Sequence, residues 1–233
     1  MDYKVNGFID GLIRLRGNSS LEGLVSIDEY PSDLGATLDR WNNLFNRFGT
    51  ILRSIEADAD SYGNDYVTDV YVSQLADLYD EIDVLEAALL ENFMELTDWE
   101  TELGSYIWDV TLPMIKEMGM PVYEAHEAEY IRANDRTMDL VFAINEKRVE
   151  LEKLGQYLLV LSGSGDVVSD IEMFSDMYDL GEIAGAYGEI REMLIELDVE
   201  ASNLKDMVKK SLYHFEFEYL GDVYEFLGGF DHI

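Results

Sequence analysis

Carboxylates are the residues of this chain best placed to do chemistry, because they gather where no base accompanies them. Between Arg53 and Lys116, 62 residues contain 16 Asp and Glu but no lysine or arginine. Such a density of carboxylates can hold cations, exchange protons or attract a basic macromolecule. Paired acids are so common here that proximity alone nominates no acid–base pair. The acids selected as a candidate partner-binding site are Glu91, Glu95, Asp98, Glu102, Asp77, Glu81 and Asp109.

The spacing of these acids favours attraction of a basic protein. On a helix, the five from Glu91 to Asp109 would form a stripe roughly 27 Å long on one face, and Asp77 and Glu81 would extend it toward the helix start. Neighbouring carboxylates would lie about 5–6 Å apart. Duplex DNA carries one charge per roughly 1.7 Å of axis, so a rigid acidic helix resembles DNA to a protein that grips phosphates. The alternative is an ordinary solvated acidic face.

One segment resembles part of an EF-hand calcium loop. Asp58–Asp69 has acids at its first, third and twelfth positions and glycine at its sixth, and carboxylates suit a hard cation. Tyr62 stands where an oxygen ligand is expected, and Asp65 replaces the usual apolar eighth residue. We therefore favour a plain interhelical loop and expect no metal.

No pattern of a known enzyme is present. The Glu-x-x-His pair of di-iron bundles would need a carboxylate at Tyr123, three residues before His126. The other histidines, His214 and His232, lie near the C-terminus. Cysteine is absent, and no nucleophile elbow, P-loop or dinucleotide fingerprint occurs. We expect a protein that is not an enzyme and has no cofactor.

The composition indicates a folded chain with a strong charge bias. Forty-nine acids face 16 bases, a formal charge of −33, yet 48% of residues are hydrophobic and 12% aromatic. Acidic disordered chains lack that apolar content. The charge disfavours direct contact with nucleic acid or an anionic membrane. No apolar stretch is long enough to span a bilayer, and the start does not resemble a signal peptide, so we expect a cytoplasmic location, in the host cytoplasm if the protein is viral.

Apolar residues recur in alternating steps of three and four, which predicts four long helices. They cover about 33–57, from about 66 to 104 or 108, about 121–161 and about 167–212. Ser32 is a candidate N-cap, and Asn92 is the polar member of the second stripe, where it could set the register. The stripe residues of the first two helices are Leu34, Leu38, Trp41, Phe45, Phe48, Leu52 and Ile55, then Tyr71, Leu75, Leu78, Ile82, Leu85, Leu89, Leu96, Trp99 and Leu103.

The helix boundaries are predicted from glycine and proline. Pro113 and Gly119–Pro121 would separate the second helix from the third, and Ser162–Gly165 the third from the fourth. Gly181, Gly185 and Gly188 would weaken the fourth helix, and they predict either a kink or a close helix contact there. The fold class is therefore all-α: an elongated bundle with coiled-coil-like spacing over 33–212. An irregular or short-helical segment (1–32) precedes it, and an aromatic-acidic segment (213–233) with strand-like alternation follows. The stripes are also compatible with a homodimer.

Two functional classes fit these features. The first is an acidic inhibitor or decoy, a DNA mimic that binds the basic nucleic-acid groove of a partner protein, as in anti-restriction, other anti-defence or nuclease-immunity proteins. The composition and helical style are similar to those of phage DNA-mimic anti-restriction proteins, although no stretch of residues matches and no residue roles carry over. The alternative is a haloadapted helical structural or assembly protein from a halophile or its virus. A coiled-coil adaptor or chaperone that shields a basic partner is a third hypothesis.

Overall fold

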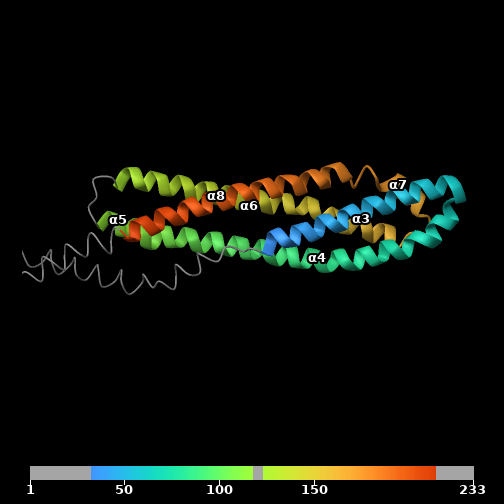
Figure 1. Ribbon diagram of the computed structural model, residues 1–233, viewed down its shortest axis with the longest axis horizontal. Coiled ribbons are helices and arrows are strands. Elements are labelled where there is room, and N and C mark those ends of the chain that lie inside the picture. Colours follow the sequence, from blue (N-terminus) through green and yellow to red (C-terminus); the bar gives the residue numbers. More distant parts are fainter. Residues whose placement is uncertain (1–32, 118–122, 214–233) are drawn as a thin grey trace, which may run out of the picture. The chain divides into compact units, whose positions relative to one another are not determined.

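The computed structural model describes residues 33–117 and 123–213, and all regular structure in these ranges is helical. The elements are α3 Asp33–Tyr62, α4 Asn64–Tyr106, the π-helical η1 Ile107–Thr111, α5 Leu112–Glu117, α6 Tyr123–Ser162, α7 Val167–Phe174 and α8 Leu180–Tyr213 (Figure 1). The predicted all-α class is confirmed, and so are the first three of the four predicted long helices. The segment 1–32, with the Ser32 cap, the Gly119–Pro121 turn and nearly all of 213–233 lie outside the described residues.

The described chain divides into two compact units. Unit 2 holds residues 33–96 and 140–196, and unit 1 holds 97–117, 123–139 and 197–213. Each of α4, α6 and α8 contributes residues to both units.

In unit 2, α3 and parts of α4, α6 and α8 bury their apolar stripes against one another. Trp41 of α3 stacks on Tyr187 of α8 at 5.9 Å, and Phe48 of α3 meets the ring of Tyr157 of α6 edge-on at 5.5 Å. The α4 stripe is buried as its spacing predicts, at Leu75, Leu78, Ile82, Leu85, Leu89 and Leu96. Asn92 lies in that stripe, and its Oδ1 is buried without a hydrogen-bond partner among the described residues.

In unit 1, the described parts of α4, η1, α6 and α8 share a second apolar cluster. Trp99, Leu103 and Ile107 are buried, as are Tyr130 of α6 and Leu204 of α8. The Lys205 ammonium lies 6.0 Å from the centroid of the Trp99 ring, a cation–π distance. The stripe predicted from 71 to 103 therefore continues through both units.

The helix breaks are fixed by local chemistry. Gly63, alone between α3 and α4, has φ 86°, a left-handed conformation that glycine adopts without strain. The Asp166 carboxylate caps α7 by accepting from the Ser169 N–H at 3.2 Å. Asp179 accepts from the N–H groups of Gly181 and Glu182, at 2.7 and 3.3 Å.

The prediction of one continuous helix over 167–212 was wrong. The chain breaks between Phe174 and Leu180 to give α7 and α8. The break lies before the glycines, because the Asp179 side chain ends the preceding segment by capping the next helix. The break at 163–166 is confirmed.

Pro113 does not end the helical path, contrary to expectation. In η1 the Leu112 N–H donates to the Ile107 carbonyl, five residues back, and α5 follows directly. Pro113 is the second residue of α5, where its missing N–H removes no α-helical bond of that helix. The π turn therefore lets the helical path continue through Pro113.

Candidate functional site

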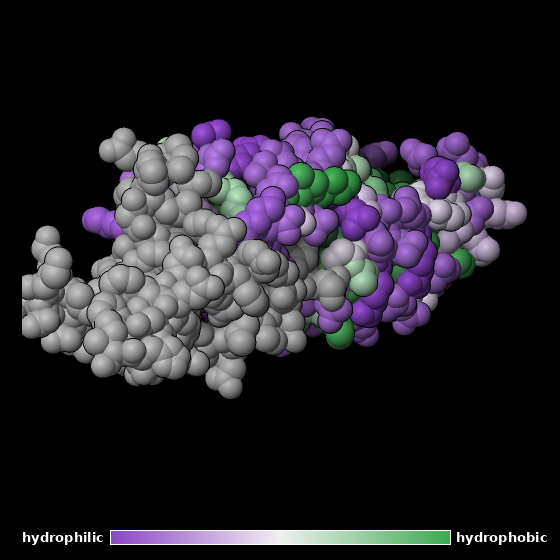
Figure 2. All heavy atoms as spheres, turned by 60° about the vertical axis from the view of Figure 1, so that its left-hand side comes forward, coloured by the Kyte–Doolittle hydropathy of each residue, from purple (hydrophilic) through white to green (hydrophobic). Residues whose placement is uncertain are grey.

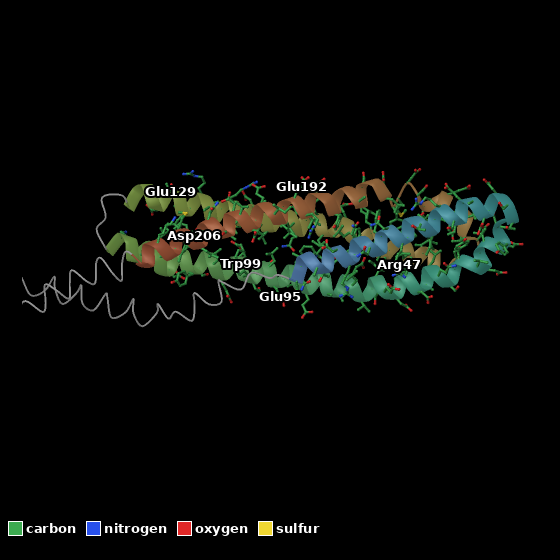
Figure 3. The ribbon with its side chains drawn as sticks, viewed as in Figure 1. Arg47, Glu95, Trp99, Glu129, Glu192 and Asp206 are labelled. Carbon is green, nitrogen blue, oxygen red and sulfur yellow. The ribbon has the colours of Figure 1, made fainter. Side chains whose placement is uncertain are left out.

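The acidic face of α4, defined here as Glu91, Glu95, Asp98 and Glu102, is exposed to solvent along its whole length. Glu91 and Glu95 belong to unit 2, and Asp98 and Glu102 to unit 1. Steps of four, three and four place them on one side of the helix, while Leu89, Leu96 and Leu103 are buried on the other. Glu95 lies on the outer edge of α4 in Figure 3. The sequence-based placement of these four residues on one exposed face is therefore what the structure has.

No described residue supplies a cation to balance the acidic face of α4. Within residues 33–117 and 123–213, no lysine or arginine lies within ion-pairing distance of these four carboxylates. Opposite charges three or four residues away normally stabilise an exposed helix, and α4 has none to offer. Hydrophilic residues cover most of the described surface in the view of Figure 2.

Glu81 differs from the acidic face of α4, because a base neutralises it. Arg47 of α3 donates to both carboxylate oxygens, at 2.5 and 2.9 Å, and Figure 3 marks Arg47 at the α3–α4 pair. This bidentate pair holds the pKa of Glu81 below its usual range and raises that of Arg47. Asp77 is exposed and lines a shallow groove with the same Arg47. Glu81 is therefore ion-paired with α3, and Asp77 lies at a groove that α3 also lines.

Asp109 is exposed, but it lies within η1 rather than in the α-helical part of the stripe. A π turn contains more residues than an α turn, so it changes the phase of the helix. Asp109 therefore does not continue the α-helical spacing of Glu91 to Glu102, and the acidic face of α4 is defined without it.

The sequence analysis missed two carboxylates that face inward from α4. The Gly155 N–H of α6 donates to Glu86 Oε1 at 3.2 Å, and burial raises the pKa of Glu86 to about 7, helped by Glu152 and Asp83 and opposed by the Gly155 bond. Burial also raises the pKa of Glu100. Helical spacing could have predicted that Glu86 faces inward, because Glu86 follows Ile82 by four residues and precedes Leu89 by three.

The plain interhelical loop expected over Asp58–Asp69 was wrong, because Gly63 alone separates α3 from α4, and a calcium loop is likewise absent from this segment. Asp58 and Asp60 lie in the last turns of α3, and Asp65 and Asp69 in the first turns of α4. Tyr71 donates its hydroxyl to Asp58 Oδ2 at 2.7 Å, which raises the pKa of Tyr71. Over the described ranges, no three metal-ligating side chains converge.

The α6 surface in unit 2 contrasts with the acidic face of α4. Lys153 pairs with Glu150 at 2.5 Å, Lys147 with Glu189 of α8 at 2.6 Å, and Arg148 with Glu152. Its acids are therefore largely matched by bases, as expected of an ordinary helix surface. The charge imbalance is a property of α4 rather than of every helix.

Comparison with known proteins gives no family or relative. No protein-family model matches the chain, and no curated protein or solved structure is significantly similar to it. None of the helices within the described ranges is long and apolar enough to cross a membrane.

Proposed function

We propose that this protein is a non-enzymatic acidic decoy that binds the basic nucleic-acid groove of a partner protein in place of DNA or RNA. The observation that carries the proposal is the acidic face of α4: four exposed carboxylates on one helix, without a cation to pair them among the described residues. A carboxylate already ion-paired within its own protein attracts a partner's cation only weakly. An unpaired carboxylate attracts that cation with its whole charge. Anti-restriction, other anti-defence and nuclease-immunity roles all fit this chemistry.

Two physical arguments support a decoy over a passive acidic surface. The carboxylates lie on a helix whose opposite side is buried, so within each unit the spacing of the two is fixed before a partner binds, which lowers the entropic cost of binding. Complementary charge also accelerates encounter with a basic groove. A cytoplasmic target, in the host if the protein is viral, belongs to the same proposal.

The test is DNA-competed capture with a charge-reversal variant. Wild-type protein on a resin is exposed to the DNA-binding fraction of a bacterial lysate, and captured proteins are displaced with duplex DNA. Glu91→Lys/Glu95→Lys/Glu102→Lys should abolish this capture. Glu146→Lys/Glu192→Lys/Asp198→Lys, three exposed acids of α6 and α8, has the same change in net charge and should retain it. Both variants should keep the wild-type helical spectrum.

Two outcomes would contradict the proposal. Capture that duplex DNA does not displace, or that both variants lose equally, would leave only non-specific charge attraction. The haloadaptation alternative makes a separate prediction for helical content by circular dichroism at about 0.05 M and about 2 M KCl, which bracket weak and strong screening. A chain that folds only at the higher salt would favour haloadaptation over the decoy.

A further inference from the structure

The two base-free parts of the sequence meet at one end of unit 2. Residues 54–115 contain no lysine or arginine, and neither do residues 154–190. The Val167 N–H donates to Thr68 Oγ1 at 3.2 Å, and Asn64 Nδ2 donates to Asp166 Oδ1 at 3.5 Å. Helix α7 also contacts α3 (Figure 1). Segments about a hundred residues apart thus build one end that has no base of its own.

A pair of exposed tyrosines stands at this end. Tyr62 is the last residue of α3 and Tyr66 lies in the first turn of α4, and their ring centroids are 4.9 Å apart at an interplanar angle of 46°. Gly63, with φ 86°, makes the turn that brings them together. Tyr62 is 66% exposed and Tyr66 47%. The rings therefore contact each other without entering the core.

Two exposed aspartates accompany the tyrosine pair on α4. Asp65 and Asp69 are exposed on α4, and Asp69 follows Tyr66 by three residues, which places it on the same side of the helix. On α7, which contacts α3, and just beyond it, Met173 and Met177 are also 68% and 63% exposed. Tyrosine and methionine are enriched in protein interfaces and are costly to leave in water. We call Tyr62, Tyr66, Asp65 and Asp69 the tyrosine end.

The tyrosine rings and the aspartates together favour a cationic ligand. The face of a tyrosine ring attracts cations, and a planar guanidinium can stack on it while also bonding to a carboxylate. Over the described residues, no lysine or arginine lies against either ring. A phosphate or a nucleic acid would be repelled by the flanking aspartates, so an anionic ligand does not fit.

We propose that the tyrosine end binds an arginine-bearing segment of a protein partner, with the guanidinium on the Tyr62–Tyr66 pair and Asp65 and Asp69 as its counter-ions. This inference rests on the proposed function, since it assigns a second contact to the same basic partner. The acidic face of α4 supplies unspecific attraction along a basic groove. The tyrosine end supplies a preference for arginine over lysine, which charge alone does not give.

The test compares fluorescently labelled nona-arginine and nona-lysine by anisotropy at about 0.15 M salt, where long-range attraction is screened beyond about 8 Å. Wild-type protein should bind nona-arginine more tightly. Tyr62→Leu/Tyr66→Leu keeps the apolar bulk and should weaken nona-arginine about 5- to 30-fold while leaving nona-lysine unchanged within about twofold. Tyr62→Phe/Tyr66→Phe should keep the preference, because it keeps the rings. Trp108→Leu removes an exposed aromatic side chain of unit 1 and is the matched control.

The outcomes separate this inference from the proposed function. An arginine preference that persists in Tyr62→Leu/Tyr66→Leu, or equal weakening of both peptides, would overturn the tyrosine end, even if DNA-competed capture through α4 succeeds. Loss of the preference together with failed DNA competition would instead support an arginine-binding end on a protein that is no decoy. If Tyr62→Leu/Tyr66→Leu has an altered helical spectrum, Tyr62→Phe/Tyr66→Phe decides the test. Loss of its preference for nona-arginine over nona-lysine would overturn the inference.

Discussion

The two units each contain a place where a polar side chain of one helix fills the space above a glycine of another. In unit 2, the Glu86 carboxyl of α4 lies against Gly155 of α6, where an added Cβ would come within 2.6 Å of both carboxylate oxygens. In unit 1 the roles are exchanged, and Asn134 of α6 lies against Gly104 of α4, with Oδ1 at 3.2 Å from an added Cβ. Both glycines are buried.

The two contacts differ in charge, and this difference has an energetic consequence. Asn134 stays neutral at every pH, so its side chain does not itself titrate. Glu86 must either ionise in a poorly solvated place or keep its proton near neutrality. The contact over the glycine is therefore made by a titratable carboxyl in unit 2 and by a neutral amide in unit 1.

The largest effect on stability is expected when the neutral amide at the unit 1 glycine is replaced by a carboxyl, as in unit 2. Asn134→Asp should destabilise the protein by about 2–3 kcal/mol at pH 8, because it places a buried carboxylate beside Gly104, a position that Glu100 Oε1 also approaches. The loss should shrink at pH 5 as the new acid takes up a proton. Urea unfolding followed by circular dichroism measures both values. Asn203→Asp, an exposed control on α8, should change neither. Equal destabilisation at pH 5 and pH 8 would mean that loss of the amide N–H donors, not charge, governs this contact.

Methyl groups on the two glycines should have unequal effects. Gly155→Ala should cost about 1–2 kcal/mol, because expulsion of Glu86 outweighs the roughly 1 kcal/mol gain in helix propensity. Gly104→Ala is the matched variant and should lie within about 0.5 kcal/mol of wild type, since Asn134 needs to move only a few tenths of an ångström. Urea unfolding at pH 6 compares them. Similar costs for both variants would contradict the closer contact assigned to Gly155.

The smallest effect concerns pH. The native pKa of Glu86, about 7, is raised above its ordinary value of 4.5, so the folded state binds the extra proton between these values. The contribution of Glu86 to stability is therefore greatest below about pH 4.5, falls as pH rises to about 7, and stays constant above. Glu86→Gln should remove this fall and gain about 1 kcal/mol at pH 8, after allowance for partial solvent screening. The measurement is the difference between the two proteins across pH 4–8. A constant difference would show that Glu86 titrates normally.

Much of the helical fold could be predicted from sequence because burial follows periodicity. Every apolar member of the stripe from Tyr71 to Leu103 is buried, since steps of three and four return to the same helix face. The break before α8 was missed although Asp179 and Glu182 have the spacing of a helix N-terminus, because the longer apolar pattern outweighed that local signal. The π turn before Pro113 could not be predicted, because the spacing of apolar residues in a single sequence does not reveal it.

The candidate site was predicted in part. The four residues of the acidic face of α4 lie on one exposed side because spacing along a single helix determines it. Glu81 was assigned to the same stripe, but its pairing with Arg47 depends on which residue of α3 lies opposite, and sequence spacing within α4 holds no such information. Glu86 was overlooked because acids are so frequent that one inside the apolar pattern did not stand out.

The sequence by itself determined the all-α class, the buried faces of the long helices and the surplus of acid on α4, since each depends on repeats within one segment. Tertiary structure alone decided which charges are neutralised, which carboxyl lies against a glycine, and that the two base-free stretches meet beside Tyr62 and Tyr66. The physical reason is that helix periodicity is a local property of the chain, whereas contacts between helices depend on how residues far apart in sequence are brought together.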